Sequence, residues 1–225
     1  GVCVFNTPGA NANAVKELVL CALFLSSRKI VAGAKWCETL KGSGDEVSKK
    51  VEKGKSNFAG PEIKGKTLGV IGLGAIGVLV ANGAKALGMD VIGYDPFLSD
   101  KAASMLDKTI RVTSVIDRIF EESDYITLHA PLNDSTKNTI CAETLVKCRD
   151  GVRILNFARG ELVNNSDILS ALESGKCSAY ATDFPTDDQL CTDGVIALPH
   201  LGASTPESEE NCAVMAVEQT VEYIE

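Results

Sequence analysis

The residues of this chain best suited to acid–base chemistry are its only two histidines, His129 and His200. The pKa of an imidazole lies near neutrality, so histidine can give and take protons under physiological conditions. His200 begins a loop of small residues, 201–205, that can carry the imidazole to a bound molecule, which makes His200 the candidate general acid or base. Helix capping is the alternative role for His200. His129 precedes Ala130 and the rigid Pro131, and we interpret it as part of a pocket wall.

Charged residues near these histidines could bind and orient an anion. Arg159 is a single cation at the end of an apolar run and is suited to a bidentate grip on a carboxylate, with a surface ion pair as its alternative role. Asp183, Asp187 and Asp188 lie in one short segment, and a catalytic histidine needs an acidic partner to hold its orientation. The sequence alone does not choose among these three acids.

A glycine-rich turn, Gly72-Leu73-Gly74-Ala75-Ile76-Gly77, is the sharpest local motif. It directly follows a β-rich run and opens a helical segment. In this context the first glycine permits the tight turn, the second lets a pyrophosphate approach the backbone, and the third lets the helix pack on the strand. The amino end of the helix supplies positive potential for the diphosphate. The motif therefore predicts a dinucleotide site.

An acid at the end of the next strand indicates which dinucleotide binds. Asp95 follows Asp90–Tyr94, where its carboxylate can accept hydrogen bonds from both ribose hydroxyls and would repel a 2′-phosphate. This placement favours NAD over NADP. Because Pro96 follows, the alternative is that Asp95 only starts a turn.

From Lys66 onward, short β-rich runs alternate with helical segments, which predicts a doubly wound parallel sheet of the Rossmann type. The carboxyl ends of parallel strands share one edge, so the residues just past those ends are expected to converge on the dinucleotide. The expected strands are Thr67–Ile71, Asp90–Tyr94, Tyr125–His129, Val152–Asn156, Cys177–Thr182 and Val195–Pro199, and the expected helices lie near 75–87, 114–121, 141–147, 165–174 and 205–223.

Three further segments carry distinct expectations. Residues 13–34 are apolar on most sides, which predicts one helix buried against another domain or subunit. Residues 41–64 are polar and glycine-containing, which is typical of a long loop. The first six residues are interpreted as a strand already under way, and both ends suggest a piece of a longer protein.

Composition excludes several classes of partner. The chain has 225 residues and a formal net charge of −8, with no basic run, so neither nucleic acid nor an anionic membrane is expected to bind. The eight cysteines are scattered without a C-x-x-C pair, which is typical of reduced thiols in a cytoplasmic protein. No metal site is expected, since the two histidines form no ligand cluster with them.

Taken together, five motifs in order resemble the D-isomer-specific 2-hydroxyacid dehydrogenases, and the resemblance covers almost the whole chain. Within that family the chain is most similar to the members that oxidise 3-phosphoglycerate. The motifs are Asn6-Thr7-Pro8-Gly9, the glycine turn with Asp95-Pro96, Leu128-His129-Ala130-Pro131-Leu132, Asn156-Phe157-Ala158-Arg159-Gly160 and Pro199-His200-Leu201-Gly202-Ala203-Ser204-Thr205.

The resemblance implies roles for individual residues. Arg159 would hold the substrate carboxylate and His200 would be the acid/base. Asp187 would stand where the family places the glutamate partner of that histidine, one methylene shorter, with Asp188 as an alternative. Asp183 would accept a hydrogen bond from the nicotinamide amide if the alignment to the family has a gap of one residue. The expected cofactor contacts are Gly72, Gly74, Ala75, Ile76, Gly77, Asp95, Pro96, His129, Ala130, Pro131, Phe157, Ala158, Asp183, Gly202 and Ala203.

The resemblance also implies an activity and an organisation. The expected reaction is the NAD-dependent oxidation of 3-phosphoglycerate, a small anionic 2-hydroxyacid, at the entry to serine synthesis. The alternatives are a glyoxylate, hydroxypyruvate or lactate enzyme of the same family, and an NAD-sensing module without catalysis. Residues 6–207 would form the dinucleotide-binding domain and residues 208–225 a helix leading back to a substrate lobe that is largely absent here. A homodimer through the 13–34 helix is expected.

Overall fold

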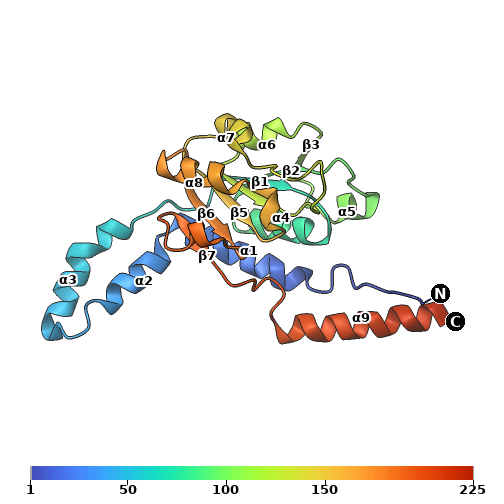
Figure 1. Cartoon of the computed structure of the whole chain (residues 1–225), viewed down its shortest axis with the longest axis horizontal. Coiled ribbons are helices and arrows are strands. Elements are labelled where there is room, and N and C mark those ends of the chain that lie inside the picture. Colours follow the sequence, from blue (N-terminus) through green and yellow to red (C-terminus); the bar gives the residue numbers. More distant parts are fainter. Residues whose placement is uncertain (1, 225) are drawn as a thin grey trace.

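The computed structural model describes residues 2–224, and its centre is a parallel sheet of seven strands in the order β3-β2-β1-β4-β5-β6-β7 (Figure 1). The predicted Rossmann fold is confirmed. Each of the six expected strands is present, two of them shorter at the carboxyl end than expected. The strands are β1 (Thr67–Ile71), β2 (Asp90–Tyr94), β3 (Arg111–Thr113), β4 (Tyr125–Leu128), β5 (Val152–Asn156), β6 (Cys177–Thr182) and β7 (Val195–Ala197).

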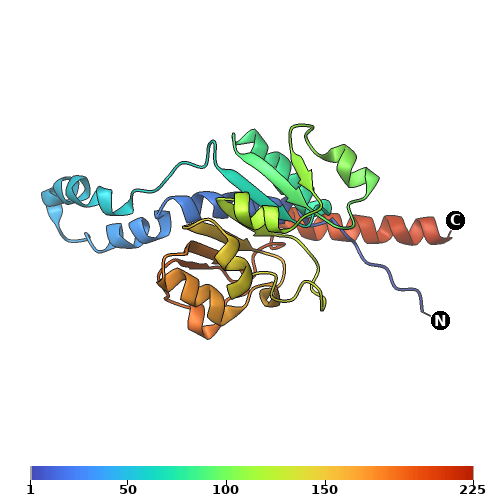
Figure 2. The same ribbon diagram turned by 90° about the horizontal axis from the view of Figure 1, so that it is seen from above.

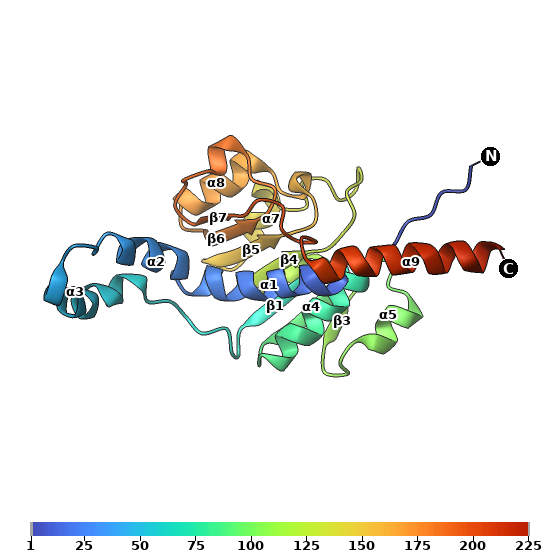
Figure 3. The same cartoon turned by 90° about the horizontal axis from the view of Figure 1, so that it is seen from below.

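Helices cover both faces of the sheet. The central strands carry apolar side chains on both faces, so each face must be shielded from water. On one face, α1 (Ala12–Ser27) and α4 (Ala75–Ala86) pack through side chains such as Leu23 and Val78 onto Leu68 and Val70 (Figure 3). The other face is covered by α6 (Asp117–Glu122), α7 (Ala142–Lys147) and α8 (Asn165–Glu173), with Phe120, Leu145 and Ile168 in the second core.

The carboxyl end of α1 is fastened to the sheet by polar contacts. The hydroxyls of Ser27 and Tyr125 are 2.7 Å apart. Arg153 donates to the carbonyl of Ser26 at 3.0 Å and stacks over the Tyr125 ring. Seen from above, α1 runs across the middle of the sheet, between the β1–β3 side and the β5–β7 side (Figure 2).

The prediction of one helix over 13–34 was wrong: α1 ends at Ser27, and α2 (Ile30–Glu38) is a separate helix with no buried residue. Arg28 is extended between them. The hydroxyls of Ser26 and Ser27 both bond back to the carbonyl of Leu23 and so compete with continued helix formation.

The prediction that residues 41–64 form a loop was also wrong, because α3 (Val47–Gly54) lies within them, flanked by 3-10 turns at Gly44–Glu46 and Lys55–Phe58. Ion pairs spaced three residues apart, Glu46 with Lys49 and Glu52 with Lys55, support this helix. Together α2, α3 and the second turn form an arm, residues 30–58, that projects from the sheet domain (Figure 1).

Two further expectations need correction. Residues 2–6 form no strand. The sequence reading also missed β3 and α5 (Asp100–Met105), which are too short to show a clear hydrophobic period.

The last helix, α9 (Pro206–Ile224), projects on the side opposite the arm, beside the amino-terminal segment, where the Phe5 and Tyr223 rings meet edge to face at 5.6 Å. Within residues 2–224, every helix is too short or too polar to cross a bilayer.

Candidate active site

The candidate site lies at the carboxyl ends of the strands, where the order of the sheet reverses between β1 and β4. The chain builds β1, β2 and β3 outward in one direction and then returns to place β4 on the other side of β1. In an open parallel sheet this reversal leaves a crevice where ligands bind. The turn after β1 and the segments after β2, β4, β5, β6 and β7 all reach this edge, as the sequence predicts.

The three glycines of the turn after β1 play the three different roles that the motif predicts. Gly72 has φ +93°, and a Cβ there would come within 2.6 Å of the His129 carbonyl carbon. A Cβ on Gly77 would collide with the carbonyl oxygen of Gly72. By contrast, no protein atom lies within 4 Å of the place where a Cβ on Gly74 would stand. The protein itself therefore does not need glycine at Gly74, and the free space is what an approaching pyrophosphate requires.

The amino end of α4 is open to an anion. Gly74 is its N-cap and no side chain caps the first turn, so the backbone N–H groups at the start of the helix remain available. Gly74 and Ala75 are exposed, and Ile76 is half-buried. The Asn6–Gly9 motif ends beside them, because a Cβ on Gly9 would lie 3.3 Å from the Cβ of Ala75.

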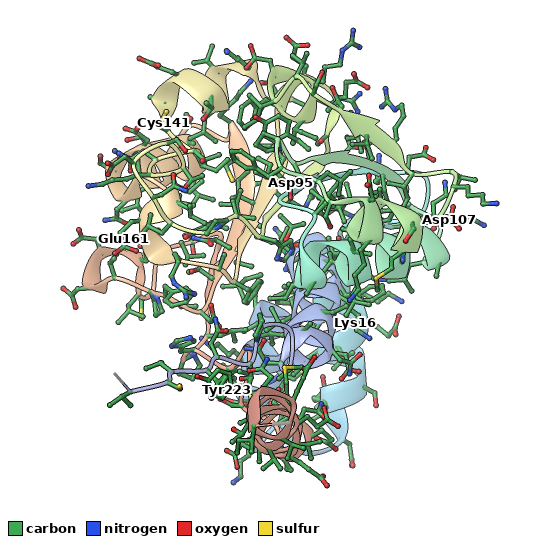
Figure 4. All side chains as sticks on the ribbon, turned by 90° about the vertical axis from the view of Figure 1, so that its right-hand side faces the viewer. Lys16, Asp95, Asp107, Cys141, Glu161 and Tyr223 are labelled. Carbon is green, nitrogen blue, oxygen red and sulfur yellow. The ribbon has the colours of Figure 1, made fainter. Side chains whose placement is uncertain are left out.

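Asp95 connects the end of β2 to the glycine turn. One carboxylate oxygen accepts from the backbone N–H of Leu73 at 2.8 Å, and the other accepts from that of Phe97 at 2.8 Å. The second contact is the turn-starting role considered above, and the first places the acid beside the dinucleotide turn (Figure 4). Each oxygen keeps a lone pair for a ribose hydroxyl.

His129 follows β4 and is held neutral. Burial lowers its pKa to about 4. Its Nε2 lies 3.0 Å from the hydroxyl of Thr127. A neutral imidazole with one fixed partner is consistent with a pocket wall, next to Ala130 and the exposed Pro131.

Arg159 follows β5 and is presented by a residue that the sequence analysis missed. The fully buried Asn156 donates from Nδ2 to the carbonyl of Arg159 at 2.8 Å and accepts from the backbone N–H of Ala158 at 3.3 Å. The signal was available, since an asparagine at the end of an apolar strand must find partners. Phe157 is buried and Ala158 half-buried beside them. Within residues 2–224, no carboxylate forms an ion pair with Arg159, so a surface ion pair is not its role in this structure.

The segments after β6 and β7 meet around Asp183 and His200. Asp183 is only 2% exposed, and its Oδ2 accepts from the backbone N–H of Gly202 at 3.2 Å. The backbone N–H of His200 donates to the carbonyl of Asp183 at 3.0 Å. The rings of His200 and Phe184 lie 4.6 Å apart, and a Cβ on Gly160 would contact Phe184 at 3.4 Å. Phe184 therefore lies between the His200 segment and the Arg159 segment.

The carboxyl group of Asp183 has one oxygen without a hydrogen-bond partner and a raised pKa. Its Oδ1 is buried without a hydrogen-bond partner. Burial raises the pKa of this carboxyl group, while the Gly202 N–H and the charge of His200 oppose that rise. An unpartnered buried acceptor is costly, so a ligand N–H donor such as a nicotinamide carboxamide fits this position.

The two other candidate acids lie farther along the same segment. Asp187 and Asp188 are exposed in the 3-10 turn Asp187–Gln189. Asp188 accepts from Nδ2 of Asn165 at 3.5 Å. Among the hydrogen bonds and ion pairs of the described residues, none joins either carboxylate to His200. Of the remaining predicted contacts, Pro96 and Ala203 are exposed and Gly202 is buried.

An NAD-type turn and a histidine and arginine on the same sheet edge define a class of protein, the dinucleotide-binding oxidoreductases. Comparison with known proteins specifies the family. Residues 22–202 match the family model described as "D-isomer specific 2-hydroxyacid dehydrogenase, NAD binding domain". The chain belongs to the D-isomer-specific 2-hydroxyacid dehydrogenase family, and its cofactor is NAD.

The relatives span several substrates. The chain is 39% identical to a hydroxypyruvate reductase of Thermotoga maritima over 97% of its own length and 69% of that protein. It is 36% identical to a D-3-phosphoglycerate dehydrogenase of Synechocystis over 97% of its own length and 38% of that protein. Among solved structures, the D-lactate dehydrogenase of Aquifex aeolicus, complexed with NAD and lactic acid, has a TM-score of 0.78 at 27% identity and covers 96% of this chain and 68% of that one. The chain thus spans well under half of the phosphoglycerate dehydrogenase that it matches.

Proposed function

We propose that this chain is the cofactor domain of an NAD-dependent D-3-phosphoglycerate dehydrogenase, which oxidises the C2 hydroxyl of its substrate to a ketone. The observation that carries the proposal is that the Arg159-Gly160 segment and the ring of His200 both lie against Phe184, and that among the described residues no carboxylate pairs with Arg159. The Arg159 guanidinium donates to the carbonyl of Ala158 at 2.6 Å and keeps further N–H donors for a substrate carboxylate, so Arg159 and His200 together could bind and deprotonate a 2-hydroxy acid. A module that only sensed NAD would have no evident need for this pair.

Each group has a role in the proposed reaction. The guanidinium of Arg159 binds the substrate carboxylate, and the imidazole of His200 takes the proton from the C2 hydroxyl. Bound NAD would supply the acceptor for the hydride that leaves C2. The free N–H groups of α4 would hold its pyrophosphate, Asp95 its ribose, and Oδ1 of Asp183 its carboxamide. Asp187 remains the proposed acidic partner of His200, and in this structure no hydrogen bond joins the two side chains.

A second candidate, a hydroxypyruvate reductase, is favoured by the 39% identity to such an enzyme. Substrate choice depends on recognising the phosphate, and the described residues show no group dedicated to it. A panel of 3-phosphoglycerate, glycerate and lactate, assayed on the full-length protein with NAD and with NADP, separates the candidates. The highest kcat/KM with 3-phosphoglycerate and NAD is the expected result, and a preference for glycerate would support the second candidate.

The same assay tests the residue roles. His200→Ala should lower kcat by about 10²–10⁴, the usual contribution of a general acid or base. Arg118→Ala, which removes an exposed ion pair on α6, serves as a control and should leave kcat unchanged. An unaltered kcat in His200→Ala would refute the catalytic role of His200.

We also propose that the protein is a homodimer in which the arm lies against a second copy. No part of the sheet domain covers α2, which has no buried residue, and Ile30 and Val31 are exposed on it. Apolar side chains on a projecting arm favour contact with another chain.

A further inference from the structure

Three polar side chains lie buried in the second core, at the ends of the strands that lead into the candidate active site. Tyr180 is 1% exposed, and Asn156 and Thr182 are fully buried, although their neighbours in this core, such as Ile154 and Ile168, are apolar. A polar group among apolar side chains costs free energy unless it forms hydrogen bonds. A cluster whose members bond to one another avoids that cost and fixes one arrangement of the strands that carry it.

The strand register places the three polar side chains together. In the pairing of β5 with β6, Ile154 lies opposite Tyr180, and Asn156 lies opposite Thr182. Residues two apart on a strand point to the same face of the sheet, so all three side chains share one face. The hydroxyl of Tyr180 hydrogen-bonds with the side chains of both Asn156 and Thr182. This hydroxyl therefore joins the last residue of β5 to the last residue of β6.

Each of these last residues holds the backbone of a segment that enters the site. Asn156 donates to the carbonyl of Arg159 at 2.8 Å. The hydroxyl of Thr182 accepts from the backbone N–H of Phe184 at 3.1 Å. Through Asn156 and Thr182, the Tyr180 hydroxyl connects the segment that carries Arg159 with the segment that carries Phe184.

The position of His200 depends on the second of these segments. Its φ of +44° lies in the left-handed region that favours glycine, so contacts with other segments must hold this backbone in place. The carbonyl of Asp183 accepts from the backbone N–H of His200 at 3.0 Å, and the His200 ring lies 4.6 Å from that of Phe184. A shift of the backbone just after β6 would therefore move the imidazole relative to Arg159.

We propose that Tyr180 is a positioning residue whose buried hydroxyl keeps Arg159 and His200 at the spacing that a 2-hydroxy acid requires. The carboxylate and the C2 hydroxyl are adjacent groups of one small molecule, so the guanidinium and the imidazole that meet them must be closely spaced. A displacement of about 1 Å in such a site can lower the rate by about 10²-fold. This role rests on the proposed function, in which these two residues bind and deprotonate the substrate.

Kinetics of the full-length protein test the proposal with the hydroxy acid of the panel that gives the highest kcat/KM. Tyr180→Phe keeps the ring and removes only the hydroxyl, and it should lower this kcat/KM by about 10- to 100-fold. The KM for NAD should not change, because the glycine turn and Asp95 lie on other strands. Tyr125→Phe is the matched control: its hydroxyl is also buried but contacts Ser27 on α1, so this variant should retain kcat/KM.

A second pair of variants tests the contact with Phe184. Thr182→Val removes the oxygen that accepts from the Phe184 N–H, and it should lower kcat/KM in the same way. Thr182→Ser retains this oxygen and should restore most of the activity. This pair decides the question if Tyr180→Phe does not fold.

Nuclear magnetic resonance of the 225-residue chain provides a readout that does not depend on turnover. The chain has only two histidines, so the Cε1–H signals of His129 and His200 can be followed separately. The ring current of Phe184 shifts the His200 signal, because the two rings are close. Tyr180→Phe should therefore move the His200 signal and leave that of His129 in place, whereas Tyr125→Phe should not move the His200 signal.

The outcomes separate this role from the proposed function. Unchanged kcat/KM in a folded Tyr180→Phe or in Thr182→Val would overturn the positioning role, and so would an unmoved His200 signal in Tyr180→Phe. An equal loss of kcat/KM in Tyr125→Phe would also overturn it, because the effect would then be one of general packing. If the unaltered protein turns over no hydroxy acid, the proposed function is refuted, while a selective shift of the His200 signal would still support the link between Tyr180 and His200.

Discussion

The two histidines of the chain differ because of their surroundings. Burial lowers the pKa of His129 to about 4, whereas His200 is exposed at a sheet edge. The unfolded chain binds a proton at His129 below pH 6.5, but the folded chain does not until about pH 4. Between these values the unfolded state holds more protons, so stability falls as the pH falls. We therefore expect His129 to make the fold less stable in acid.

At this residue scale, the acid sensitivity is measurable. Between pH 7 and pH 5, His129 should account for a loss of about 2 kcal/mol in the free energy of unfolding. Urea denaturation at both pH values should show a smaller loss in His129→Gln than in the unaltered chain. Equal losses in the two proteins would contradict a half-buried His129 that stays neutral.

At the scale of elements, two glycines in the unit of β1, the glycine turn and α4 have different roles. Gly77 is needed for folding, and Gly74 is needed for binding. A methyl group at Gly77 meets a backbone carbonyl that cannot move away, whereas one at Gly74 meets no protein atom. Gly77→Ala should therefore destabilise the fold by about 1–3 kcal/mol. Gly74→Ala, at an ordinary φ of −73°, should cost less than about 1 kcal/mol in stability.

Binding should show the opposite order. A methyl group at Gly74 would occupy the space for the pyrophosphate and so remove a hydrogen bond between the backbone and the pyrophosphate. Loss of one hydrogen bond to a charged group lowers the affinity for NAD by about 10- to 100-fold. Thermal unfolding and NAD titration of both variants provide the measurements. Normal NAD affinity in Gly74→Ala would show that the pyrophosphate lies elsewhere.

At the scale of the whole molecule, charge is distributed unevenly along the chain. The arm, residues 30–58, holds six basic and four acidic side chains, although the chain as a whole is acidic. Residues 177–225 hold ten acidic side chains and no lysine or arginine. A second copy therefore offers an acidic surface that complements the arm, and such complementarity favours association at low salt.

This complementarity gives a prediction for assembly. Sedimentation should show a homodimer that weakens between 50 and 500 mM salt, values of the order at which surface charges become screened. Replacing Lys49, Lys50 and Lys53 on α3 with glutamate should weaken it further, whereas the same change at Lys101 and Lys108 should not. A chain that stays monomeric at every salt concentration would refute the proposed dimer.

The sequence by itself determined the sheet, the glycine turn and the strand ends that carry His129, Arg159, Asp183 and His200. These features are local: a strand shows its apolar run, and a tight turn against a helix requires glycine, whatever surrounds it. The site residues could be listed because parallel strands present their carboxyl ends together.

Only the tertiary structure decided features that depend on distant partners. The break at Arg28 accompanies the contacts of Ser26 and Ser27 with Arg153 and Tyr125, more than ninety residues away. Asn156 was missed because its partners are backbone groups of the loop that it shapes. The backbone N–H of His200 donates to the carbonyl of Asp183, while Asp188 contacts Asn165. Residue types and spacing leave such choices open, because the packing of one segment on another fixes which side chains meet.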